Sequence, residues 1–159
     1  MGLFKKKTEE FLYAPAEGNL LKLEQVNDKV VSQKLLGDGI ACIPQNDTIC
    51  SPCDGKIAMI AETSHAFGIT MASGAEIIVH VGLDTVNLNG EGFQVLAEVG
   101  QKVKAGTPVL KLDLGFMHEK NIDLTIPVIV TNSSGYTMEI LQEEGKAGLQ
   151  TKVIKIVRK

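Results

Sequence analysis

Two of the three histidines in this chain, His65 and His80, are fifteen residues apart and lie on either side of one tight-turn signal. An imidazole ring is both a nucleophile and a hydrogen-bond donor, so two adjacent rings could take up a small anionic group and hold it between them. Such chemistry needs both rings on one surface. The elements that carry the two histidines therefore decide whether the pair can act.

The residues on both sides of a Ser73-Gly74 turn signal have strand character and predict a β-hairpin. With a two-residue loop, Phe67 lies opposite His80 in this hairpin. His65 and His80 then become diagonal neighbours on one face, at a separation of roughly 7–8 Å. Both rings could therefore reach one small group held between them.

Side-chain alternation divides the predicted hairpin into two faces. One face is aliphatic and predicts a core, whereas the other is an apolar surface that carries both histidines. A register shifted by one residue would turn one histidine to the opposite face, and each histidine taken alone could be a hydrogen-bonded structural residue. Because both histidines lie on the same predicted face, the pattern favours a functional site over two separate structural residues. The face that carries them comprises Thr63, His65, Phe67, Ile69, Ile78, His80, Gly82 and Asp84.

Composition limits the classes of protein to which this chain can belong. Its 159 residues, 44% of them hydrophobic, suffice for one domain with a buried core. A net charge of −3 and the absence of Trp argue against a nucleic-acid-binding surface. No apolar run reaches the ~18 residues needed to span a bilayer and no signal peptide is evident, so we expect a cytoplasmic protein without stable membrane insertion. We expect residues 1–10 to form a flexible tail and residues 11–159 to form a single domain.

The three cysteines, Cys42, Cys50 and Cys53, are an odd number in a chain without an export signal, and we expect reduced thiols. The spacing of Cys50 and Cys53 formally matches a redox or half-zinc motif. Neither a second pair of metal ligands nor a βαβ context accompanies that motif. The pattern therefore favours buried cysteines that act as small hydrophobic side chains.

Short apolar segments separated by Gly, Pro, Asn and Asp predict an all-β chain with little helix. The fold class that follows is an antiparallel β-sandwich or barrel. The best helix signal is at residues 117–121. Besides the hairpin, the expected strands are 20–23, 40–43, 57–60, 95–98, 109–112, 128–130, 138–141 and 153–157.

Residues 74–86, GAEIIVHVGLDTV, match without a mismatch the phosphohistidine signature of the glucose-type enzyme IIA proteins. These proteins belong to the bacterial phosphoenolpyruvate-dependent sugar phosphotransferase system. The resemblance extends over nearly the whole chain, so residues 11–159 resemble one EIIA type-1 domain. Further matching segments are 37–41, 62–67, 90–93 and 126–132.

The resemblance implies an antiparallel β-sandwich of the duplicated-hybrid-motif type and the function of a phosphotransferase component. By that resemblance His80 carries the phosphoryl group on Nε2, with His65 as its partner. The backbone carbonyl of Gly82 is expected to accept a hydrogen bond from Nδ1 of His80. The implied phosphoryl donor is the histidine phosphocarrier protein HPr, and the acceptor is the IIB domain of a membrane sugar permease. No cofactor is implied, and the expected state is a monomer.

Phosphoryl transfer between two imidazoles also gives roles to the neighbouring residues. His65 would donate a hydrogen bond to the phosphoryl oxygens, and Thr63 would orient the His65 ring. Asp84, predicted opposite Thr63, would either help to dock a basic partner or be a plain exposed carboxylate. An apolar collar that excludes water and contacts the partner is predicted from Val31, Phe67, Ile69 and Ile78.

Two other functions fit parts of this pattern. His80 and Asp84 have the H-x-x-x-D spacing of some zinc-dependent hydrolases with related β-folds, and His65 could be a third ligand. No His-x-His pair supports that assignment, although an adventitious zinc ion at His65 and His80 is chemically reasonable. A binding module whose histidines only contact a partner is the second alternative.

Overall fold

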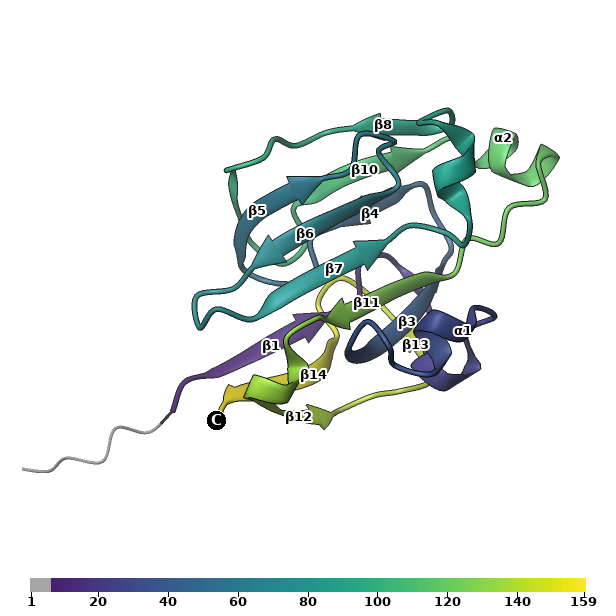
Figure 1. The fold of residues 1–159 in the computed structure, drawn as a ribbon. Helices are drawn as coiled ribbons and strands as arrows, with labels where there is room; N and C mark the ends of the chain where they lie inside the picture. The colour runs from purple at the N-terminus through teal and green to yellow at the C-terminus, as the bar shows by residue number, and fades with distance from the viewer. Residues whose placement is uncertain (1–6) are drawn as a thin grey trace, which may run out of the picture.

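The computed structural model describes residues 7–159, which form antiparallel β-sheets with short helices between the strands (Figure 1). This confirms the predicted all-β, antiparallel class. The part of the predicted tail at residues 1–6 lies outside the described residues. In chain order the strands are β1 (Glu9–Tyr13), β2 (Gly18–Lys22), β3 (Asp38–Pro44), β4 (Thr48–Cys50), β5 (Gly55–Ile60), β6 (Ala66–Thr70), β7 (Glu76–His80), β8 (Phe93–Val95), β9 (Lys102–Val103), β10 (Pro108–Leu112), β11 (Ile126–Val130), β12 (Tyr136–Ile140), β13 (Gly145–Ala147) and β14 (Lys152–Arg158).

Five short helical segments connect these strands in the described part of the chain. They are η1 (Leu23–Gln25), α1 (Lys29–Ser32), η2 (Thr85–Leu88), α2 (Leu114–Glu119) and η3 (Ser133–Gly135). Asp113 caps α2 by accepting a hydrogen bond from the Phe116 N–H at 3.0 Å, and this cap begins the helix earlier than the predicted segment 117–121. Within residues 7–159 no helix is long and apolar enough to cross a membrane.

Three sheets make up the sandwich that the structure describes. The largest has the order β13-β2-β3-β11-β7-β6-β5-β9, and the two smaller sheets have the orders β1-β14-β12 and β4-β10-β8. Figure 1 shows the β1-β14-β12 sheet below β11 and β3, with α1 beside β3. Glu9 and Glu10, which the sequence places in the predicted tail, belong to β1 and pair with β14. β8 ends at Val95, where the sequence predicted a strand over 95–98.

The main core lies between the sheets, on the inner face of the eight-stranded sheet. Val79 of β7 and Val128 of β11 pair across this sheet, and both are fully buried. Leu12 and Ile154 reach the same cluster from β1 and β14, and Leu110 reaches it from β10. Each such side chain contributes roughly 1.5–3 kcal/mol to folding, so this core fixes the strands that carry the histidines.

A second, smaller cluster covers part of the outer face of the same sheet. Ile129 of β11 pairs with Ile78 of β7, and both side chains therefore lie on the face opposite Val79. The segments η1 and α1 pack onto this outer face against β3 and β11, and Leu83, three residues after His80, belongs to the same cluster. The cluster comprises Leu23, Val26, Val31, Ala41, Leu83 and Ile129.

The register of the histidine hairpin differs by one residue from the prediction. His80 pairs with Ala66, and Val79 pairs with Phe67. The loop contains three residues, 72–74, because the Met71 N–H donates to the Ala75 carbonyl at 2.9 Å. A three-residue loop with a left-handed glycine is a common hairpin connection, and the two-residue loop predicted from Ser73-Gly74 is wrong.

All three cysteines are buried and unpaired, as the sequence predicted. Burial raises the pKa of Cys42 to about 12 and the pKa of Cys50 to about 11. Burial also raises the pKa of the Cys53 thiol. Because the thiolate is the reactive form, these thiols are inert at neutral pH and act as small core side chains.

Candidate active site

His80 is the last residue of β7, and its side chain lies on the outer face of the sheet with Ile78. Nδ1 of His80 is 2.7 Å from the backbone carbonyl oxygen of Gly82. A carbonyl oxygen can only accept a hydrogen bond, so Nδ1 must carry the ring proton. In the neutral ring Nε2 then keeps its lone pair and can attack an electrophile.

Gly82 holds the carbonyl in place through a backbone conformation that few other residues adopt. Its φ is +84°, and a Cβ built at this position would lie 2.5 Å from Cγ2 of Thr85 and 3.2 Å from the carbonyl oxygen of Asp123. The turn is fixed further because the Leu83 N–H donates to the same Asp123 carbonyl at 2.8 Å. This geometry restricts position 82 to glycine.

Thr85 is a buried supporting residue that the sequence analysis missed. Its hydroxyl donates to the Val81 carbonyl at 2.8 Å and lies 3.3 Å from the Gly82 carbonyl that also accepts from His80. Its only sequence signal was its place inside the 74–86 signature. Thr85 therefore helps to aim the acceptor that selects the tautomer of His80.

His65 lies in the turn between β5 and β6, immediately before β6 begins. Simple alternation would place it on the core side with Phe67, but Ser64 has a left-handed φ of +59° and redirects the chain. The His65 carbonyl accepts from the Val81 N–H at 2.7 Å, which ties this turn to the strand of His80. The two imidazole rings are neighbours, with centroids 4.9 Å apart and planes at 72°.

Thr63 contacts the His65 ring, with Oγ1 2.5 Å from Nδ1. Burial first, and then the nearby His80, lower the pKa of His65 below its ordinary value. His65 is therefore neutral at neutral pH. If the Thr63 hydroxyl donates to Nδ1, the proton of His65 resides on Nε2, where it is available to a group between the two rings.

Asp84 lies outside the hairpin and does not pair with Thr63, because the strand pairing ends at Ala66 and His80. It is the N-cap residue of η2, with a left-handed φ of +57°, and its exposed side chain makes no capping hydrogen bond. The predicted cross-strand position of Asp84 is therefore wrong. Its charge faces solvent after the turn that carries Gly82.

The predicted apolar collar is corrected at two positions by the register. Phe67 is 0% exposed and Ile69 is 1% exposed, because both point to the inner face with Val79 and Ile77. Neither can contact a partner. Ile78 is half-buried on the outer face, as predicted, whereas Val31 is only 6% exposed and anchors α1 to the sheet.

The comparisons with known proteins agree with one another. The family model for the phosphoenolpyruvate-dependent sugar phosphotransferase system, EIIA 1, matches residues 10–136. The chain belongs to this family. It is also similar to the solved structure of glucose permease IIA from Mycoplasma capricolum, with a TM-score of 0.86, 36% sequence identity, and coverage of 98% of this chain and 99% of that one. The described fold is therefore the EIIA β-sandwich, and the chain is a phosphotransferase-system component.

Curated relatives of this chain include a protein named as an EIIA component and a longer protein named as an EIICBA component. The glucose-specific EIIA component of Borreliella burgdorferi is 41% identical over 133 residues, which are 84% of this chain and 70% of the relative. The glucose-specific EIICBA component of Staphylococcus carnosus is 39% identical over 91% of this chain. This chain spans only 22% of that longer relative. The match to the EIIA family does not favour a zinc-dependent hydrolase.

Four exposed apolar side chains on the segments that flank the site have no signal in the sequence. Val30 lies in α1, Leu35 and Leu36 follow that helix, and Val86 lies in η2, shortly after the turn that follows His80. Val31 of α1 packs in one cluster with Ile129 of β11 and with Leu83, the residue after Gly82. Phe67 and Ile69 are not among the exposed side chains. Within residues 7–159 no three His, Cys, Asp or Glu side chains are grouped so as to hold a metal ion.

Proposed function

We propose that this EIIA chain is a phosphoryl carrier that accepts a phosphoryl group from phospho-HPr on Nε2 of His80. It then passes the group to the IIB domain of a sugar permease. The observation that carries this proposal is the 2.7 Å contact between Nδ1 of His80 and the Gly82 carbonyl, with the His65 ring 4.9 Å away. One ring is set as the nucleophile, and a neutral donor stands beside it.

In the transfer, the lone pair of His80 Nε2 attacks phosphorus while the bond from phosphorus to the donor histidine nitrogen breaks. No proton needs to move, because the His80 proton stays on Nδ1. Positive charge develops on the His80 ring, and the Gly82 carbonyl dipole stabilises it. The Nε2–H of His65 can donate to the phosphoryl oxygens, whose charge spreads in a loose transition state.

Partner docking is assigned to the outer face around the histidines. Ile78 and the apolar side chains near α1, Val30, Leu35 and Leu36, provide a surface that excludes water without a large buried area. A limited surface suits a carrier, because HPr must leave before the IIB domain binds. Asp84 supplies an exposed negative charge at the rim for a basic partner. The carrier acts as a monomer, since each transfer pairs one chain with one partner.

The direct test is an intact-mass measurement after incubation with phosphoenolpyruvate, enzyme I and HPr. The chain should gain one phosphoryl group, and peptide mapping should place it on His80. His80→Gln should abolish the gain. A chain that stays unmodified under conditions that fully phosphorylate HPr would instead favour a binding module.

His65→Gln separates the two histidine roles. The variant keeps the nucleophile and should still reach the phosphorylated state, more slowly. Onward transfer to a IIB domain should fall by about 10²–10³-fold, the usual effect of losing one hydrogen-bond donor to a transition state. Onward transfer at the wild-type rate would remove His65 from the mechanism.

A further inference from the structure

The corner formed by η1, α1 and the turn into β3, residues 23–38, ends its helix in an unusual way. The Lys34 N–H donates to the Val31 carbonyl at 3.0 Å, and the Leu35 N–H donates to the Val30 carbonyl at 3.0 Å. This is the Schellman pattern, in which glycine usually occupies the left-handed position. Here Lys34 occupies it, with φ +59°.

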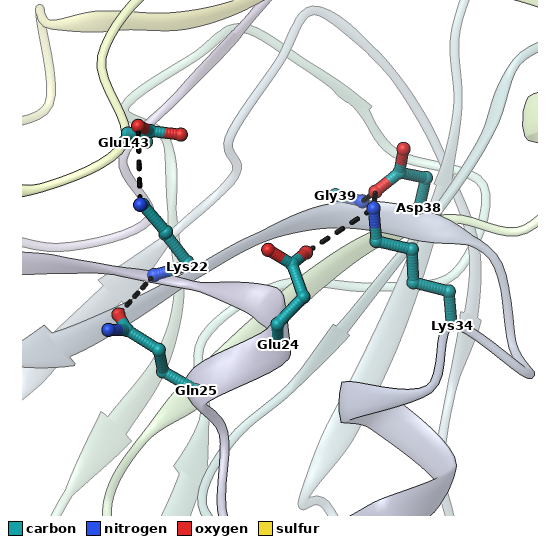
Figure 2. Close-up of polar contacts among 7 residues, drawn as sticks. All are labelled: Lys22, Glu24, Gln25, Lys34, Asp38, Gly39 and Glu143. Carbon is teal, nitrogen blue, oxygen red and sulfur yellow. Dashed lines mark hydrogen bonds and ion pairs between the residues drawn. The ribbon is translucent and has the colours of Figure 1, made fainter.

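The Lys34 ammonium joins the two segments that flank α1. Its Nζ lies 3.3 Å from Oε1 of Glu24 in η1 and 3.4 Å from Oδ1 of Asp38, the first residue of β3 (Figure 2). Burial alone would lower the pKa of Lys34, but the two carboxylates outweigh it and raise that pKa. The Asp38 oxygen is itself fixed, because it also accepts from the Gly39 N–H at 2.8 Å.

The rest of this corner is weakly held. The helix α1 has four residues, too few to be stable alone, and Val31 is its one buried side chain. Lys22 secures the other end: its N–H donates to Oε1 of Gln25, and its Nζ is 3.6 Å from Oε1 of Glu143 (Figure 2). Beyond Lys34, Leu35 is 68% exposed and Leu36 is 47% exposed. Their direction therefore depends on the few anchors of the corner.

We propose that Lys34 is a positioning residue for the docking of phospho-HPr: its two ion pairs hold the corner so that Val30, Leu35 and Leu36 face the incoming HPr. This inference rests on the proposed function. Exposed ion pairs contribute little to global stability. Loss of the Lys34 ion pairs should therefore change how many molecules hold residues 30–36 in the docking orientation, and should not unfold the chain. The apparent affinity for a partner drops by the fraction of molecules whose corner is competent to bind.

Four variants test this. Lys34→Asn removes the charge but keeps a residue that tolerates the left-handed conformation. Lys34→Arg keeps the charge. Glu24→Gln removes one of the two ion pairs. Lys29→Asn is the matched control, because it removes a positive charge from the same helix and Lys29 forms no ion pair in the described structure. For each variant the KM for phospho-HPr, the kcat, the melting temperature and the amide hydrogen exchange of residues 30–36 are measured.

Lys34→Asn should raise the KM for phospho-HPr about fivefold, as expected when about one molecule in five keeps a competent corner. The kcat and the melting temperature should change little, and the amides of residues 30–36 should exchange faster. Lys34→Arg should have the wild-type KM. The KM of Glu24→Gln should lie between those of the wild type and Lys34→Asn, and Lys29→Asn should have the wild-type KM and the wild-type exchange rates. An unchanged KM and unchanged exchange in Lys34→Asn would overturn the proposal, as would an equal rise in KM for Lys29→Asn.

The proposed function can fail separately. Phosphoramidate, a small donor that needs no docking surface, should phosphorylate wild-type and Lys34→Asn chains at the same rate. If the wild-type chain accepts phosphate from phosphoramidate but not from phospho-HPr, the proposed function is wrong, whatever the exchange data show for the corner. If the wild type accepts from phospho-HPr and Lys34→Asn has the same KM, only the role of Lys34 is wrong.

Discussion

The hydroxyl oxygen of Thr63 lies 2.5 Å from Nδ1 of His65, whose ring centroid is 4.9 Å from that of His80. Gly82 and a donating Thr63 hydroxyl would set opposite tautomers in the two rings. The Gly82 carbonyl accepts from His80 and leaves its Nε2 bare, whereas a hydroxyl that donates to His65 leaves the proton on its Nε2. In the proposed mechanism one ring is the nucleophile and its neighbour the donor because their Nδ1 atoms have different partners.

Replacing Thr63 by Val keeps the shape of the side chain and removes the hydroxyl. We expect phosphoryl transfer to slow by about tenfold, the usual scale for losing a residue that orients a site ligand. Thr63→Ser should retain near wild-type transfer. Stopped-flow measurement of transfer from phospho-HPr checks both variants, and equal rates for Val and Ser would contradict the orienting role.

The lowered pKa of His65 predicts how stability depends on pH. Because the folded chain binds the His65 proton less readily than the unfolded chain does, the unfolded state takes up more protons as the pH falls below the ordinary value of 6.5. The free energy of unfolding is therefore highest above that pH, and it decreases as the pH falls from 6.5 through the lowered pKa of His65. Urea unfolding from neutral to mildly acidic pH should show this loss, and the loss should be smaller in His65→Gln. An identical pH profile for the two proteins would refute the prediction.

Gly82→Ala should destabilise the chain by about 2–4 kcal/mol, because it combines a left-handed φ with a Cβ that meets Thr85. The double variant Gly82→Ala with Thr85→Ser separates these two causes. Serine keeps the hydroxyl bond to Val81 and lacks the Cγ2 atom that the new Cβ would meet. Urea denaturation should therefore show partial rescue, with the cost of the backbone conformation remaining.

The sequence predicted the antiparallel β-fold and the proximity of His65 and His80, and it failed at the register between them. A Ser-Gly turn suits loops of two or three residues equally well, and the difference of one residue exchanges the two faces of a strand. The histidines still meet because His65 leaves the strand at Ser64, a left-handed turn at a residue that is not glycine. That compensation has no signal in residue types.

The residues around α1 show a second limit of sequence reasoning. A four-residue helix has too short a hydrophobic period to stand out in the sequence. The sequence therefore predicts Val31 as a partner contact, although it is buried, and gives no signal for exposed Leu35 and Leu36. The left-handed conformation of Lys34 could not be read either, since glycine is the usual signal for it. Local patterns thus predict the closeness of the two histidines more readily than the exposed side chains of the α1 segment.

Phe67 and Ile78 provide a matched pair for testing the corrected register. Phe67 is fully buried in the main core, so Phe67→Ala should cost about 3–5 kcal/mol of unfolding free energy. Ile78 is half-buried on the outer face, so Ile78→Ala should cost less stability and should raise the KM for phospho-HPr. In the originally predicted register both side chains would share the histidine face, and both variants would weaken docking alike. Denaturation midpoints and transfer kinetics of the two variants therefore distinguish the registers, and a stable Phe67→Ala chain with a raised KM would favour the rejected one.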